Sequence, residues 1–86
     1  MKWNTLINKK PIDGQVCLVQ EAYKPSNKNE IRFTDTIAAE YNLKDNKWQI
    51  FMTHDGQFID VCTNCDLNDK WIYFKDAFNY QSIECN

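Results

Sequence analysis

The chain has 86 residues and a formal net charge of −2, and 43% of its residues are hydrophobic, 14% aromatic and 26% charged. This composition is typical of a globular domain, and with only two Gly and two Pro it excludes collagen-like and linker-like chains. No apolar run approaches the roughly 20 residues of a membrane-spanning helix, and Met1–Asn4 lacks the apolar stretch of a signal peptide. We therefore expect one soluble, cytoplasmic domain over residues 1–86.

Charge is distributed unevenly along the chain. Residues 51–86 contain six Asp or Glu and two Lys, whereas residues 1–50 contain eight basic and six acidic residues. Nucleic-acid binding needs a clustered basic surface, so an isoelectric point of about 5.2 argues against it. The acidic half suits a basic patch on a protein partner, which would steer association more than strengthen it.

The first predicted elements are a turn and a strand. Pro11–Gly14 has turn chemistry, and the nearly continuous apolar run Gln15–Gln20 is typical of a strand that is covered on both faces. The preceding segment, Trp3–Ile7, is either a strand or an irregular cover over the sheet. The polar segment Lys24–Glu30 is expected to be a loop.

The clearest periodicity lies in residues 31–44. Odd positions are apolar except Asp35, and even positions are polar except Ala38, which predicts a half-buried strand. Asp45-Asn46 and Asp55-Gly56 then predict two hairpin turns. The resulting antiparallel meander of three strands would align apolar residues on one face, in the pairs Leu43–Trp48, Tyr41–Ile50, Ala39–Met52, Met52–Ile59 and Ile50–Val61.

The end of the chain predicts one more strand and a helix. Trp71–Phe74 is the strand candidate, and the spacing of Phe74, Ala77 and Phe78 allows a short terminal helix. We therefore predict a mainly β fold, with α+β as the alternative. It would be a small antiparallel sheet of about four to five strands with the meander at its centre.

Cys62-Thr63-Asn64-Cys65 is the one recognisable chemical spacing among the four cysteines. On a tight turn the two thiolates would hold one edge of a Zn²⁺ tetrahedron, which Cys17, Cys85 or His54 would complete. The pair lacks the second close pair of a zinc ribbon, and the residues after it do not resemble the helix that follows a thioredoxin-like motif. We expect reduced thiols and no cofactor, with zinc at Cys62 and Cys65 as the alternative.

The predicted register does not bring catalytic groups together. His54 faces Gln57 instead of a thiol, and Asp60 lies beside Phe51 and Glu40 on an open sheet face that desolvates a carboxylate little. The sequence also contains no phosphate-binding glycine loop. We therefore expect no enzymatic activity.

Two phenylalanines define the predicted binding surface. Phe51 and Phe58 project from the face of the meander opposite the expected core, with Glu40 and Asp60 at the rim. An apolar patch with a polar rim is typical of protein-binding surfaces. The alternative is that another segment of the chain covers both rings. The predicted protein-binding residues are Phe51, Phe58, Asp60 and Glu40.

Five short motifs follow one another along the chain: Trp3, Pro11–Val16, Ile37–Tyr41, Asn46–Trp48 and Trp71. In this order the sequence resembles a family of short phage and prophage proteins of unknown function, although Lys70 stands where that family has a His before the last Trp. The resemblance implies a compact β-rich module encoded by a mobile genetic element. The expected partner is then a bacterial host or defence protein that the module inhibits or modulates. The alternative is a zinc-stabilised β module that contacts nucleic acid.

Overall fold

The computed structural model describes residues 2–26, 29–54 and 57–77, and of residues 52–54 and 58–60 it describes only the backbone. Within these residues, six strands form one antiparallel sheet in the order β1-β8-β2-β5-β6-β7, and two strands form a separate ladder, β3-β4. Their bounds are β1 Asn4–Thr5, β2 Val16–Gln20, β3 Ala22–Tyr23, β4 Arg32–Phe33, β5 Ile37–Asn42, β6 Lys47–His54, β7 Gln57–Asn64 and β8 Lys70–Tyr73. A short helix begins at Phe74.

The mainly β class, the antiparallel sheet and the short C-terminal helix are confirmed, and the sheet has one strand more than the upper expectation. The additional strand is β1, near the N-terminus, which pairs with β8. β8 inserts between β2 and β1, so that Val19 lies opposite Trp71 and Asn4 also pairs with Trp71. In the described part of the chain no helix is both long and apolar enough to cross a bilayer.

One face of the sheet carries the core. Side chains on alternate positions of β2, β5, β6 and β8 meet there with Leu6 from the N-terminal segment, and the fully buried members are Cys17, Val19, Ala39, Tyr41, Trp48 and Trp71. Tyr41 and Trp48 contact edge to face, with ring centroids 5.3 Å apart. Two of the three tryptophans thus fill the centre of a small core, where large rings bury much area per residue.

The meander is confirmed, but only one of its two predicted registers is correct. The β6–β7 ladder pairs Ile50 with Val61 and Met52 with Ile59, as expected. The β5–β6 register is shifted by two residues, so that Tyr41 lies opposite Trp48. A shift of two keeps every side chain on its predicted face, which is why the apolar pattern could not reveal it.

The cause of the shift is a four-residue turn at 43–46 in place of a two-residue turn. The Asn42 side-chain oxygen accepts a hydrogen bond from the Asp45 backbone N–H (3.1 Å), and Asn46 adopts a positive φ of 54°. The Leu43 N–H donates to Asp13 Oδ1 (2.9 Å). Leu43 is therefore 50% exposed instead of contributing to the core.

The single long strand predicted over 31–44 is wrong. Its first part, β4, pairs with β3, whereas β5 pairs with β2 and β6. Between them Thr34 bonds the chain at Glu21 twice: its N–H donates to the Glu21 carbonyl, and its hydroxyl accepts from the Glu21 N–H, both at 2.9 Å. Beyond this clamp, β3 and β4 form a ladder of their own, and we call the described residues 22–26 and 29–33 the arm.

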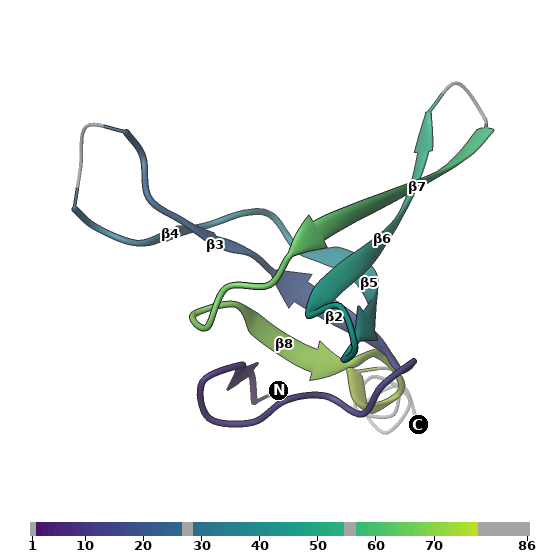
Figure 1. The fold of residues 1–86 in the computed structure, drawn as a ribbon, viewed down its shortest axis with the longest axis horizontal. Helices are drawn as coiled ribbons and strands as arrows, with labels where there is room; N and C mark the ends of the chain where they lie inside the picture. The colour runs from purple at the N-terminus through teal and green to yellow at the C-terminus, as the bar shows by residue number, and fades with distance from the viewer. Residues whose placement is uncertain (1, 27–28, 55–56, 78–86) are drawn as a thin grey trace, which may run out of the picture.

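Figure 1 shows the arm and the β6–β7 hairpin projecting from the body of the sheet in different directions. The arm is tied to the body at its base. The Lys70 ammonium lies 4.2 Å from the centre of the Phe33 ring, and the Ala22 N–H donates to Asp69 Oδ1 at 2.7 Å. These contacts hold the separate β3-β4 ladder against the body of the sheet.

Candidate functional site

The four residues predicted to bind a protein do not all come together. Phe51 lies opposite Asp60 in the β6–β7 ladder, as expected. Glu40 was expected beside Phe51, but the β5–β6 register places it opposite Gln49, two residues before Phe51 in β6. Phe51 and Glu40 are both half-buried. The side chains of Phe58 and Asp60 lie outside the described residues, so this patch stays a prediction.

The cysteine pair is not on the tight turn that zinc binding would need, because β7 continues through Asn64. Cys62 is exposed and its thiol lies 2.8 Å from Gln49 Oε1, whereas Cys65 packs against the buried core cluster. Among the described residues there is no group of three or more His, Cys, Asp or Glu that could hold a metal ion. Cys85 lies outside these residues, and zinc binding therefore stays an untested alternative.

The predicted environment of His54 is confirmed as far as the backbone shows it, since the residue opposite is Gln57. Its side chain lies outside the described residues. The ladder therefore supplies no thiol as the direct cross-strand neighbour of this imidazole.

A buried carboxylate that the sequence patterns did not single out organises the centre of the molecule. Asp69 is 1% exposed and accepts three hydrogen bonds. Its Oδ1 accepts from the Ala22 N–H (2.7 Å), and its Oδ2 accepts from Trp48 Nε1 and from the Asp66 N–H, both at 2.9 Å. The carboxylate thus joins the arm, the main core and the turn at 66–69.

Hydrogen bonds within the turn at 66–69 hold it in shape, and most of them are accepted by Asp66. Asp66 Oδ1 accepts from the Asn68 N–H at 2.8 Å, and the Asp69 N–H donates to the Asp66 carbonyl at 2.9 Å. Asp and Asn side chains commonly bond the backbone two residues ahead, so the run Asp66-Leu67-Asn68-Asp69 carried a turn signal. The sequence does not indicate which of the two carboxylates, Asp66 or Asp69, is buried.

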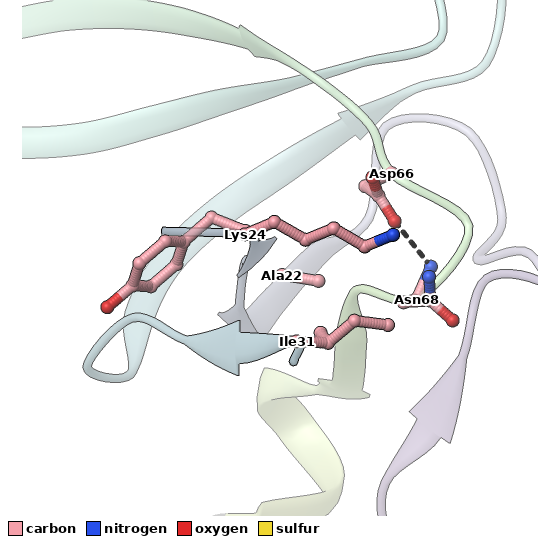
Figure 2. A pocket seen from close by; sticks show the side chains of 6 residues that line it. Ala22, Lys24, Ile31, Asp66 and Asn68 are labelled. Atoms are coloured by element: carbon pink, nitrogen blue, oxygen red, sulfur yellow. Dashed lines mark hydrogen bonds between the residues drawn. The ribbon is translucent and has the colours of Figure 1, made fainter. Parts of the chain in front are cut away.

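A hollow of about 350 Å³ lies where the arm meets this turn. It is lined by Ala22, Tyr23, Lys24, Ile31, Asp66 and Asn68. Figure 2 shows the long Lys24 side chain along one side, with its nitrogen directed toward Asp66, and Ala22 and Ile31 on the other side. The hollow therefore combines apolar walls with a polar end, which is the usual make-up of a binding pocket.

Exposed apolar side chains surround this hollow. Tyr23 is 48% exposed and Ile31 is 40% exposed, and both belong to its lining. Leu67, at the tip of the adjacent turn, is 58% exposed. We call Tyr23, Ile31, Leu67 and the hollow between arm and turn the arm surface. Single exposed apolar residues are common on protein surfaces, whereas a group of them around a hollow often marks a binding site.

Two thiols are protected from ionisation by the protein around them: Cys17 is buried and Cys65 is half-buried. Burial raises the pKa of the Cys17 thiol from 9.0 to about 12. Burial also raises the pKa of Cys65 to about 12, with a further upward contribution from the negative charges of Asp69 and Glu21 that Lys10 partly opposes. The pKa of Tyr41 is raised as well, chiefly by burial.

These shifts predict an order of thiol reactivity. At pH 8, iodoacetamide should alkylate the exposed Cys62 at least about tenfold faster than Cys17 or Cys65, because only the thiolate reacts. The same two groups should make the fold weaken as pH rises from about 9 toward 12, since the unfolded chain loses these protons first. Peptide mapping by mass spectrometry and urea unfolding at several pH values measure the two effects. Equal labelling rates in the native protein would show that the fold does not shield Cys17 and Cys65.

The fold and the arm surface define a small mainly β protein with a pocket-bearing hairpin, and they do not identify a reaction. No family model, curated protein sequence or solved structure matches the chain.

Proposed function

We propose that the chain is a small, non-enzymatic protein-binding module whose arm surface contacts the partner. The observation that supports this is the exposure of Tyr23 and Ile31 around a hollow with a polar end. A partner side chain in this hollow would be enclosed by apolar groups and by Asp66 and Asn68. A few residues in well-packed pockets, most often Trp, Tyr or Arg, commonly provide most of the energy of protein–protein binding.

The way in which the arm is held supports the same proposal. Its base is fixed by the Asp69–Ala22 bond and by the paired bonds between Glu21 and Thr34. A surface whose shape is set before binding loses less conformational entropy when the complex forms. In line with the resemblance to phage proteins, we propose that the partner is a bacterial protein, bound in the host cytoplasm and inhibited or modulated by the module.

The test compares variants of the arm surface with an equally exposed residue elsewhere. Ile31→Ser and Tyr23→Ala should each weaken partner binding by about tenfold or more, because each removes a wall of the hollow. Leu43→Ser is the matched control, since Leu43 is 50% exposed on the 43–46 turn. Affinity capture from a bacterial lysate, followed by calorimetry with the captured protein, measures the effect. Unchanged binding by both arm variants would refute a role for the arm surface.

The same assay tests the surface predicted from the sequence. Phe51→Ala and Glu40→Lys change that face without touching the lining of the hollow. If these variants lose the partner while Ile31→Ser retains it, the binding face is the outer side of the meander. The two candidate surfaces thus give opposite patterns, and thermal unfolding of each variant confirms that the fold is kept.

A further inference from the structure

Within the residues that the structure describes, no strand pairs with the outer edge of β7, which we call the open edge. β7 is the last strand of the six-stranded sheet, and it spans eight residues, whereas β1 at the other end of the sheet spans two. Its pairing with β6 runs from Asn64 to Gln57 without a bulge. A long regular edge strand presents a row of backbone donors and acceptors to which another strand can bind.

The directions of these groups follow from the ladder. The Cys65 N–H donates to the Asn46 carbonyl at 3.1 Å, so the Asn46–Cys65 position is a hydrogen-bonded pair that continues the β6–β7 ladder. In an antiparallel ladder such pairs alternate with pairs whose backbone groups point away. The N–H and C=O groups of Cys62 and Asn64 therefore point away from β6, toward the open edge.

The residues of β7 provide few of the usual protections of an edge. Proteins commonly protect edge strands with Lys, Pro, bulges or short length. The sequence of β7, Gln57–Asn64, contains neither Lys nor Pro, and Asp60 is its one charged residue. Cys62 and Asn64, whose backbone groups face the edge, are both exposed.

The charge around this strand indicates the chemistry of its partner. From Lys47, which lies opposite Asn64, to Asp69 the sequence has four aspartates and one lysine, a net charge of −3. Asp69 is buried and bonded internally, but Asp66, two residues after the end of β7, is exposed. A second copy of the chain would bring the same acidic stretch to the edge, whereas a segment with Lys or Arg would be attracted to it.

We propose that the open edge of β7 binds an extended, Lys- or Arg-bearing segment of a partner protein, which adds to the sheet as a seventh strand. Backbone hydrogen bonds to Cys62 and Asn64 provide affinity, and basic side chains beside the acidic stretch provide selectivity. This edge shares no residue with the lining of the hollow. The proposal therefore goes beyond the arm surface, and either can fail without the other.

A synthetic probe tests the edge directly. The probe is a capped peptide of alternating Lys and Val, which as a strand places all Lys on one face, and the control is the same peptide with Glu in place of Lys. In nuclear magnetic resonance titrations of the full chain at 50 mM salt, the Lys peptide should shift the Cys62 and Asn64 amide signals and slow their hydrogen exchange. The Glu peptide should bind at least tenfold more weakly, and 500 mM salt should weaken the Lys peptide several-fold.

A proline substitution removes one edge donor while leaving the β6 ladder intact. Cys62→Pro should weaken the Lys peptide by tenfold or more, because proline lacks the N–H and is tolerated on an outward edge. Cys62→Ser, which keeps the N–H and a donor toward Gln49, should bind like the unchanged chain. If Cys62→Pro does not fold, Asn64→Pro with Asn64→Thr as its control replaces it.

Three results would overturn the proposal. One is no shift at Cys62 and Asn64 with the Lys peptide, and another is equal binding of the Lys and Glu peptides. The third is dimerisation of the chain that Cys62→Pro or Asn64→Pro abolishes, because the occupant of the edge would then be a second copy. Loss of binding in Ile31→Ser without a change in peptide binding would separate the arm surface from this edge.

Discussion

Asp69→Ala is expected to lower the free energy of unfolding by about 3–5 kcal/mol. The substitution removes the only acceptor that the structure shows for the side chain of Trp48 and for the N–H groups of Ala22 and Asp66. A buried donor left without a partner costs about 1–3 kcal/mol, and the three costs are not fully additive. A chain of this length has a total stability on the order of 4–13 kcal/mol, so the loss would remove about a quarter of it at the upper end of that range and all of it at the lower end.

Urea unfolding followed by tryptophan fluorescence measures this loss, and graded variants locate its origin. Trp48→Phe removes one donor from the network and should cost less than Asp69→Ala. Asp69→Asn should fall between the two, because an amide offers one acceptor atom where the carboxylate uses two. Asp66→Ala is the matched control, since Asp66 is exposed and its side chain bonds one backbone N–H. A loss below about 1 kcal/mol for Asp69→Ala would show that the network does not hold the fold together.

The same carboxylate connects stability to the proposed binding surface. Asp69 bonds Ala22 at the start of the arm and Asp66 at the far side of the hollow, so it sets the distance between the two sides. Thr63 adds a second tie, because its hydroxyl donates to Glu21 Oε2 at 2.7 Å. Trp48→Phe should keep partner binding, since it leaves the bonds of Asp69 to Ala22 in the arm and to Asp66 in the turn in place.

Patterns with a short period predicted most of the fold. Alternation over 37–42 and the Asp55-Gly56 signal placed the inner face of the meander correctly, because each depends on neighbours in sequence. The prediction was wrong where a distant contact decided the outcome. Residues 34–36 read as part of a strand, but Thr34 bonds Glu21, thirteen positions earlier, and the chain turns away there.

The candidate site was the least predictable part for the same reason. The hollow combines three segments, 22–24, Ile31 and 66–68, which no local spacing relates. Its polar end depends on the burial of Asp69 beneath the turn, and an aspartate in a polar run gives no sign of being buried. The spacing of Cys62 and Cys65 is typical of a metal-binding pair, but β7 continues through Asn64, so that Cys62 is exposed and Cys65 packs against the core.

Trp71→Ala is expected to cost about 3–5 kcal/mol, the usual range for removing a large buried ring. Trp71 is fully buried, and the centroid of its ring lies 4.9 Å from the centroid of the Tyr73 ring. It also holds the N-terminal segment, because Nε1 donates to the Lys9 carbonyl at 2.9 Å. Two effects are therefore combined in this variant: loss of core volume and release of residues 6–11.

Trp71→Phe separates these effects, because it keeps a ring in the core but removes the bond to Lys9. It should cost about half as much stability, and under native conditions trypsin should cut after Lys9 several-fold faster relative to Lys44, an exposed site on the 43–46 turn. Tyr73→Phe is a second probe, since the Tyr73 hydroxyl accepts from the Ile12 N–H at 3.0 Å. If Trp71→Phe raises cleavage after Lys9 and Lys44 equally, the change is global unfolding, and the Lys9 bond does not anchor the N-terminal segment.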